Sequence, residues 1–203
     1  MAGRVVAVVD SGINPGHPHI GSVVGGVWLR ADGSEDADWV DRIGHGTAVA
    51  AAIHEKAPEA EFLAVRVFDR TLATSVEVLA RAIAWSAEHG ARFINLSLGT
   101  SNPAHADALR GALTAATRLG ATVVSAAQHD GVVWYPGSLD GAVGVILDWD
   151  CRRDKIRQVA SDGQQLFAAS GYPRPIPGVE PDRNLKGISF AVANVTGYLA
   201  ASS

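Results

Sequence analysis

The chain has 203 residues, with 17 Lys and Arg against 21 Asp and Glu and a formal net charge of −4. This length suits one domain with a sizeable core, and we expect a single domain over residues 1–203. The slightly acidic charge excludes the basic surface that nucleic-acid binding needs, so we expect no nucleic-acid partner. No apolar run approaches the roughly 18 residues that cross a membrane, so we expect no membrane partner either.

The start of the chain and its cysteine content indicate a cytoplasmic protein. Residues 1–9 lack the basic and apolar regions of a secretion signal. Cys151 is the only cysteine, which excludes an internal disulfide and a zinc site built on several thiolates.

The first third of the chain begins with an apolar strand over residues 5–9, typical of a strand buried on both faces of a parallel sheet. The pattern then predicts a glycine-containing strand over 22–29, an acidic loop over 31–42, a helix of small residues from 45 that ends before Pro58, and a strand over 61–68. Thr74 or Ser75 can cap an amphipathic helix that ends at Gly90.

The rest of the chain continues with a strand over 92–99, a helix between Asn102 and Gly120, and a strand over 121–127. Three short strands are predicted within 142–147, 154–160 and 166–169, and a last helix over 189–200. Strand and helix alternate through the first two thirds, which predicts an α/β fold with a mostly parallel, doubly wound sheet.

Asp10 follows the first apolar strand directly, in "VVAVVDSGIN". Ligands of open α/β sheets bind beyond the carboxyl ends of the strands, so this carboxylate lies where a functional group is expected. The alternative is that Asp10 only forms a turn in "DSG".

His45 differs from the other six histidines because it lies between two glycines, in "GHGT", at the start of a helix. Flanking glycines would allow a substrate or a nucleophile to approach the imidazole closely. The alternative is a structural or helix-capping histidine.

Ser189 lies at the start of the last helix, in "KGISFAVANVTG". Its hydroxyl can cap that helix, or it can be a nucleophile near the positive end of the helix dipole. A serine nucleophile needs an imidazole as general base, and that imidazole needs a carboxylate to fix its tautomer. Asp10, His45 and Ser189 supply these three groups.

Six segments occur in the order and nearly the wording of a subtilisin-like serine peptidase: "VVAVVDSGIN", "GHGTAVA", "INLSLG", "VVSAAQHDG", "YPGSLDGAVGV" and "GISFAVANVTG". The resemblance runs from about Arg4 to Tyr198. It implies a three-layer subtilisin-like fold, here minimal and shortened at both ends. It also implies that Asp10 orients the general base His45 and that Ser189 is the nucleophile.

The resemblance also implies a place for the substrate. Leu96, Ser97, Leu98 and Gly99 resemble the strand whose backbone pairs with an extended peptide. Ser125, Ala126 and Ala127 resemble the opposite wall of the first specificity pocket.

The chain departs from the family where the oxyanion donor is expected. The family usually has Ala-Gly-Asn where this chain has Ala127, Gln128 and His129. Loss of one oxyanion donor costs about 10²–10³ in turnover, as found in subtilisin itself. The N–H of His129 could replace the missing asparagine amide, and Gln128 is a second candidate.

Further departures concern the helix after the nucleophile, the first pocket and the calcium loop. Ala193 and Asn194 replace the Pro and His that usually follow the serine. Trp134 or Tyr135 is a candidate for the mouth of the first pocket, although core packing is the more common role of such a Trp. If Trp134 lines the pocket, small side chains before the cut are expected. The family's usual calcium loop has no room before residue 61, so we expect no metal and no cofactor.

These residues favour a serine endopeptidase that cuts a peptide or protein substrate, and its altered site suits a dedicated maturation protease with one client. Small subtilases that remove leader peptides, such as the one for quinohemoprotein amine dehydrogenase, look similar. One alternative is a pseudoprotease that binds a peptide as a scaffold. A phosphate- or metal-binding α/β domain is disfavoured because no glycine-rich phosphate loop follows the first strand.

Overall fold

The computed structural model describes residues 4–69, 71–160 and 164–203. The predicted domain over 1–203 therefore includes residues 1–3, 70 and 161–163, which lie outside the described residues. The strands are β1 (Val5–Asp10), β2 (Val23–Leu29), β3 (Glu35–Asp36), β4 (Glu61–Arg66), β5 (Phe93–Leu96), β6 (Thr122–His129), β7 (Val132–Val133), β8 (Ala142–Leu147), β9 (Ile156–Val159) and β10 (Leu166–Ala169). The α-helices are α1 (His45–Lys56), α2 (Val76–Glu88), α3 (Ala106–Arg118) and α4 (Ile188–Ala201), and two 3₁₀ turns are η1 (Pro103–His105) and η2 (Pro181–Arg183).

One sheet of the order β3-β2-β4-β1-β5-β6-β8-β10-β9 joins the strands, and β7 pairs with β6. The pairs between β2 and β10 along this order are parallel, whereas β3 and β9 run antiparallel at the two edges. The predicted α/β fold with a mostly parallel, doubly wound sheet is confirmed. Because β1 lies between β4 and β5, its carboxyl end opens at the middle of the sheet edge.

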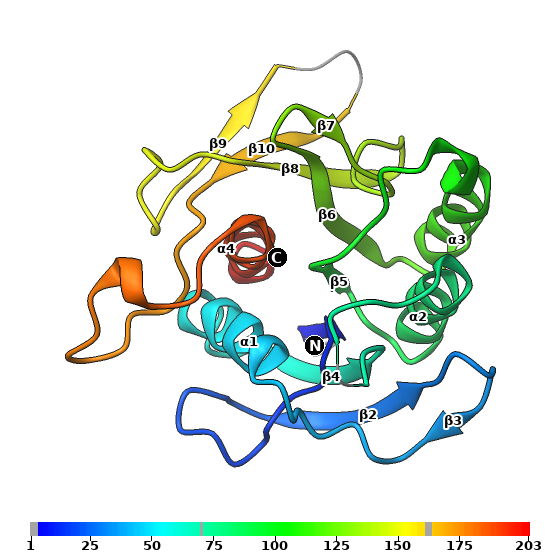
Figure 1. Ribbon diagram of the computed structural model, residues 1–203, viewed down its shortest axis with the longest axis horizontal. Coiled ribbons are helices and arrows are strands. Elements are labelled where there is room, and N and C mark those ends of the chain that lie inside the picture. Colours follow the sequence, from blue (N-terminus) through cyan, green and yellow to red (C-terminus); the bar gives the residue numbers. More distant parts are fainter. Residues whose placement is uncertain (1–3, 70, 161–163) are drawn as a thin grey trace.

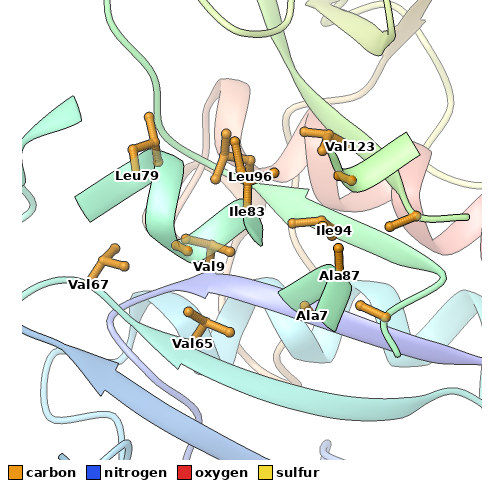
Figure 2. Packing of buried hydrophobic residues seen from close by; sticks show 14 of the residues in the cluster. Ala7, Val9, Val65, Val67, Leu79, Ile83, Ala87, Ile94, Leu96 and Val123 are labelled. Atoms are coloured by element: carbon orange, nitrogen blue, oxygen red, sulfur yellow. The ribbon is translucent and has the colours of Figure 1, made fainter. Parts of the chain in front are cut away.

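Helices cover both faces of the sheet, which gives three layers (Figure 1). Helices α2 and α3 lie on one side, and α1 and α4 lie on the other. Figure 2 shows how α2 packs: Leu79, Ile83 and Ala87 lie over the strands, near Val9 and Ile94. Burial of such aliphatic side chains contributes about 1.5–3 kcal/mol each.

Helix α4 lies in the middle of its layer. It packs against α1 and against five strands, β5, β6, β8, β9 and β10. Its residues from Phe190 to Gly197 are all buried. The helix is apolar all round, as expected for a helix inside a core.

The predicted elements differ from the structure mainly at their ends. The strand predicted over 92–99 ends at Leu96, because residues 97–99 leave the sheet. The helix predicted after Asn102 begins as the 3₁₀ turn η1, with Pro103 at its first position. The two-residue strands β3 and β7 are too short to give a sequence pattern. Among the described residues, no helix has both the length and the hydropathy needed to cross a bilayer.

Candidate active site

Asp10 and His45 form a buried hydrogen-bonded pair at the carboxyl end of β1. Asp10 is fully buried, and its carboxylate lies 2.8 and 2.9 Å from Nδ1 of His45. An ionised carboxylate only accepts hydrogen bonds, so Nδ1–H of His45 is the donor. The neutral ring therefore keeps its lone pair on Nε2. The backbone N–H of Ser11 donates a further bond of 2.7 Å to Asp10.

The surroundings of His45 favour its protonated form. Burial of the ring lowers the pKa of His45, but the hydrogen bond to Asp10 and the charges of Asp10 and Asp41 raise it more. The net result is a pKa above the ordinary 6.5. A proton gained by Nε2 is thus stabilised by the two carboxylates.

The glycines that flank His45 shape the start of α1. Gly44 has a φ of 94°, a left-handed conformation that favours glycine. A Cβ on Gly46 would lie 2.2 Å from the carbonyl oxygen of Gly12, so only glycine allows α1 to approach the end of β1 so closely. The sequence argument explained these glycines by access of a substrate to the ring, whereas the structure shows a conformational reason at Gly44 and close chain packing at Gly46.

Ser189 is the second residue of α4, after Ile188. Gly187 is the residue that precedes the helix. The hydroxyl of Ser189 donates to the carbonyl oxygen of Ser97 at 3.3 Å. The next side chain, Phe190, is buried, with its ring centre 5.7 Å from that of His45. Within the described residues Ser189 makes no hydrogen bond to His45, so the direct bond expected from the sequence is not formed. Such bonds are often long before substrate binds.

Asp41, which the sequence analysis left in an acidic loop, holds the start of α1. Its Oδ1 accepts from the backbone N–H groups of Ile43 and Gly44 and from the Ser11 hydroxyl, at 2.8–2.9 Å. Its Oδ2 accepts from the N–H and the hydroxyl of Thr47, at 2.9 and 2.6 Å. Burial raises the pKa of Asp41, but these hydrogen bonds outweigh that effect and lower it. An aspartate just before a helix is a capping signal that could have identified it.

A buried arginine anchors the loop that carries Asp41. Arg66 donates from Nε to the carbonyl oxygen of Phe68 and from Nη1 to that of Asp38, both at 3.0 Å. Its guanidinium also lies over the ring of Trp28, 3.8 Å from the ring centre. The loop before His45 is therefore tied to the sheet by charge-assisted bonds.

Asn95 connects α4 to the segment beside Ser189. The hydroxyl of Thr196 donates to Oδ1 of Asn95 at 2.9 Å, and Nδ2 of Asn95 donates to the hydroxyl of Ser97 at 2.9 Å. Asn95 and Thr196 are fully buried. A polar residue inside the apolar strand "INL" was the available sequence signal.

The predicted substrate strand is divided between the core and the surface. Leu96 is fully buried in β5, whereas residues 97–99 are partly exposed. Inside the described chain, the backbone N–H groups of Ser97, Leu98 and Gly99 make no hydrogen bond. This short edge can therefore pair with another extended chain.

Trp134 and Tyr135 close the far end of this edge. Tyr135 and Thr100 exchange two backbone hydrogen bonds, at 2.8 and 2.9 Å. A Cβ on Gly99 would lie 2.4 Å from the oxygen of Tyr135 and 3.4 Å from the Trp134 ring. Trp134 also packs against the core cluster that contains Ala126. Trp134 thus combines core packing with a place beside Gly99.

The other wall predicted for the first pocket lies in β6. Ser125, Ala126 and Ala127 are all buried, and the hydroxyl of Ser125 has no partner within the described residues. The carbonyl oxygen of Ala127 accepts from the N–H of Trp134 at 2.9 Å.

Gln128 and His129, the predicted oxyanion donors, form a hairpin with β7. They pair with Val133 and Val132, and Nε2 of His129 lies 3.5 Å from the carboxylate of Asp130. Both residues line a hollow of about 320 Å³ together with Asp130, Ile146, Leu147 and Trp149. In the described chain neither side chain hydrogen-bonds to Ser189.

The two residues that replace the family's Pro and His have structural contacts. Ala193 is fully buried. Nδ2 of Asn194 donates to the carbonyl oxygens of Ser170 and Tyr172 at 2.8 and 3.1 Å. Asn194 therefore fixes the segment after β10 onto α4. No group of three or more His, Cys, Asp or Glu could hold a metal ion in residues 4–69, 71–160 and 164–203.

Comparisons with known proteins agree with this arrangement. The model of the subtilase family matches residues 2–201. Thermophilic serine proteinase from Bacillus sp. is 34% identical over 217 residues, which are 100% of this chain and 49% of that protein. Thermitase from Thermoactinomyces vulgaris is 32% identical over 223 residues, which are 98% of this chain and 76% of that protein. The chain thus spans about half of the first relative.

Solved structures show the same fold. The prenylagaramide maturation protease PagA matches with a TM-score of 0.69 and 28% identity, over 97% of this chain and 73% of that chain. Sphericase matches with a TM-score of 0.74 and 22% identity, over 99% and 77% of the two chains. The family model and a relative 32% identical over nearly the whole chain show that the chain belongs to the subtilase family of subtilisin-like serine peptidases.

Proposed function

We propose that this protein is a serine endopeptidase in which Ser189 is the nucleophile, His45 the general base and Asp10 the residue that orients the base. The observation that carries this proposal is the hydrogen bond from Nδ1 of His45 to the buried carboxylate of Asp10. This bond leaves Nε2 of the neutral ring free to accept a proton. The chemistry needs that tautomer.

In the first step the Oγ atom of Ser189 bonds to the scissile carbonyl carbon, and the hydroxyl proton moves to Nε2 of His45. The C–N bond then breaks, and His45 returns this proton to the leaving amine. Water, deprotonated by His45, attacks the acyl-enzyme and releases the acid and the Ser189 hydroxyl. For this, the Ser189 hydroxyl must exchange its bond to Ser97 for one to His45.

The acyl part of the substrate would pair with residues 97–99. The backbone N–H groups of residues 97–99, which have no partner in the part of the chain that the structure describes, support this assignment. The backbone N–H of Ser189, at the first turn of α4, is suited to bind the oxyanion. His129, with Gln128 as second candidate, is proposed as the other donor, which requires its side chain to turn away from Asp130.

We further propose that the enzyme is a maturation protease that cuts one partner polypeptide. The likeness to PagA, whose description is that of a maturation protease, supports this role. The replaced oxyanion donor also suits an enzyme that gains much of its rate from specific docking of its client.

A covalent serine-hydrolase probe, of the fluorophosphonate class, tests the proposal. We expect labelling of the native protein and none of the Ser189→Ala variant, with the Ser203→Ala variant as matched control. The assay should include extract of cells that express the protein, so that a client can complete the site. Comparison of cells that express the native protein with cells that express the Ser189→Ala variant then identifies the polypeptide that is shortened.

The second candidate is a pseudoprotease that binds a peptide without cutting it. The bond from Ser189 to Ser97 rather than to His45 is the observation that favours it. Absence of labelling, together with retained peptide binding, would support this alternative and contradict the endopeptidase.

A further inference from the structure

A cavity of about 570 Å³ lies beside the start of α1. Three segments line it: the turn over 14–19, the stretch from Asp41 to Ala51, and the loop over 173–185 that precedes α4. Two of these segments lead directly to the site, because Ile43 comes two residues before His45 and Leu185 four residues before Ser189.

Arg174 is the charged residue in this cavity that has no carboxylate partner within the described residues. Its Nη1 donates only a long bond of 3.5 Å to the carbonyl oxygen of His19. Burial lowers the pKa of His19 and of His54, and the charge of Arg174 lowers both further. A half-buried guanidinium without a counter-ion is costly unless an anion binds it.

The other charged groups around the cavity are already engaged. The carboxylate of Asp41 accepts five hydrogen bonds, from its own loop, from α1 and from the Ser11 hydroxyl. Arg42 donates to Asp38 at 2.8 Å. Glu55, which raises the pKa of His19, is bonded to Arg153. Arg174 therefore stays available to a ligand.

The neutral lining completes a site for a peptide. Nδ1 of His17 accepts the N–H of His19 at 3.2 Å. Ile43, Ile176 and Leu185 are 39–50% exposed and form an apolar rim. Among the residues that line the cavity, none comes from 97–99, the segment assigned to the acyl part of the substrate. Since two of its lining segments lead to His45 and Ser189 and none contains residues 97–99, we assign the cavity to the leaving segment.

We propose that this cavity binds a carboxylate of the substrate, carried by an Asp or Glu side chain in the segment that leaves as the amine product. Arg174 is the counter-ion, and the apolar rim contacts the neighbouring side chains of that segment. This inference rests on the proposed endopeptidase function. It assigns a specificity-determining residue outside the Asp10, His45 and Ser189 group.

The test uses a peptide library derived from a proteome, with cleavage sites identified by mass spectrometry. For the native protein we expect Asp and Glu to be enriched about tenfold after the cut, the size of one charge-assisted bond. Arg174→Gln should remove this enrichment, and Arg174→Glu should replace it by enrichment of Lys and Arg. Arg118→Glu, on exposed α3 across the sheet, is the matched control and should change nothing.

Absence of acidic enrichment, or its persistence in Arg174→Gln, overturns the proposal. If no cleavage depends on Ser189, the proposed endopeptidase function is wrong. A peptide-binding experiment then tests the carboxylate site separately. The same library is passed over immobilised Ser189→Ala protein with and without Arg174→Gln. Retention of acidic peptides that needs Arg174 supports the carboxylate site, and equal retention by both proteins overturns it.

Discussion

The Thr47 hydroxyl donates to Oδ2 of Asp41 at 2.6 Å and itself accepts the backbone N–H of Asn14 at 3.0 Å. The Thr47 side chain thus joins the loop after β1 to the loop before α1, in addition to the bond from the Ser11 hydroxyl to Asp41. The Asp10–His45 bond crosses the same junction. Its geometry therefore depends on residues that do not touch the imidazole.

Replacement of Asp41 tests this dependence. Asp41→Asn keeps one acceptor oxygen and adds an N–H₂ group that faces donors, so we expect a loss of about 2 kcal/mol in the free energy of unfolding. Urea unfolding measures this loss. Asp107→Asn, at an exposed ion pair of α3, is the control and should stay within about 0.5 kcal/mol. Equal stability of the two variants would contradict the role given to Asp41.

The raised pKa of His45 has two consequences for pH dependence. A base must be neutral, so kcat/KM should fall on the acid side with a midpoint above 6.5, the ordinary histidine value. Because the pKa is raised by folding, His45 stabilises the fold fully below the unfolded pKa, and this contribution is lost as pH rises through the folded pKa. The difference in the free energy of unfolding between the wild type and His45→Gln should therefore shrink as pH rises from the unfolded pKa through the folded pKa of His45.

Asp10→Asn separates the effects of charge and geometry. The His45 titration, followed by NMR, should move to lower pH. Turnover should fall by about 10⁴ because the asparagine favours the wrong tautomer of His45. A His45 titration at the wild-type midpoint would contradict this assignment.

His129 is the critical residue of the proposed oxyanion site. His129→Ala should lower kcat by about 10²–10³ with little change in KM, and His129→Asn should retain activity. Gln128→Ala distinguishes the second candidate. Steady-state kinetics on a cleaved peptide is the measurement, and unchanged kcat in His129→Ala rules out that donor.

The buried amide of Asn194 can be tested through its charge. Asn194→Asp places an acceptor-only carboxylate against the carbonyl oxygens of Ser170 and Tyr172, and we expect a loss of about 3 kcal/mol at pH 7. The buried acid has a raised pKa, so part of the loss should be recovered as pH falls. Asn102→Asp, at the exposed cap of η1, is the control, since aspartate caps equally well. A pH-independent effect would contradict the orientation of the amide.

Trp134 is expected to limit the residue before the cut. Trp134→Ala should admit larger side chains there, at a cost of about 3 kcal/mol in stability because the ring packs on the core. Cleavage-site profiling and unfolding measure the two effects separately. Efficient cleavage after large aromatic residues by the native protein would refute the proposed restriction.

The fold was largely predictable because its strands are apolar runs and its helices have capping and ending residues. The alternation of these elements indicates the parallel sheet, and the resemblance adds the three layers. The position of Asp10 at a strand end follows from the same pattern, because β1 is buried on both faces.

The supporting residues were less accessible to sequence reasoning. Asp41 acts through hydrogen bonds to its own loop, whose conformation no periodicity reveals. Asn95 and Thr196 meet across 101 residues of sequence. The role proposed for Arg174 depends on the cavity that the turn over 14–19 and the loop over 173–185 line together in the folded protein.

Helix α4 supplies Ser189 and fills the middle of one layer. A ribosome adds about 5–20 residues per second, and the polypeptide emerges from its amino end. Asp10, His45 and the sheet strands that α4 covers are therefore synthesised before Ser189. Under the proposed mechanism, a nascent chain that has not yet reached α4 lacks both its packed interior and its nucleophile, so it would not hydrolyse a peptide bond.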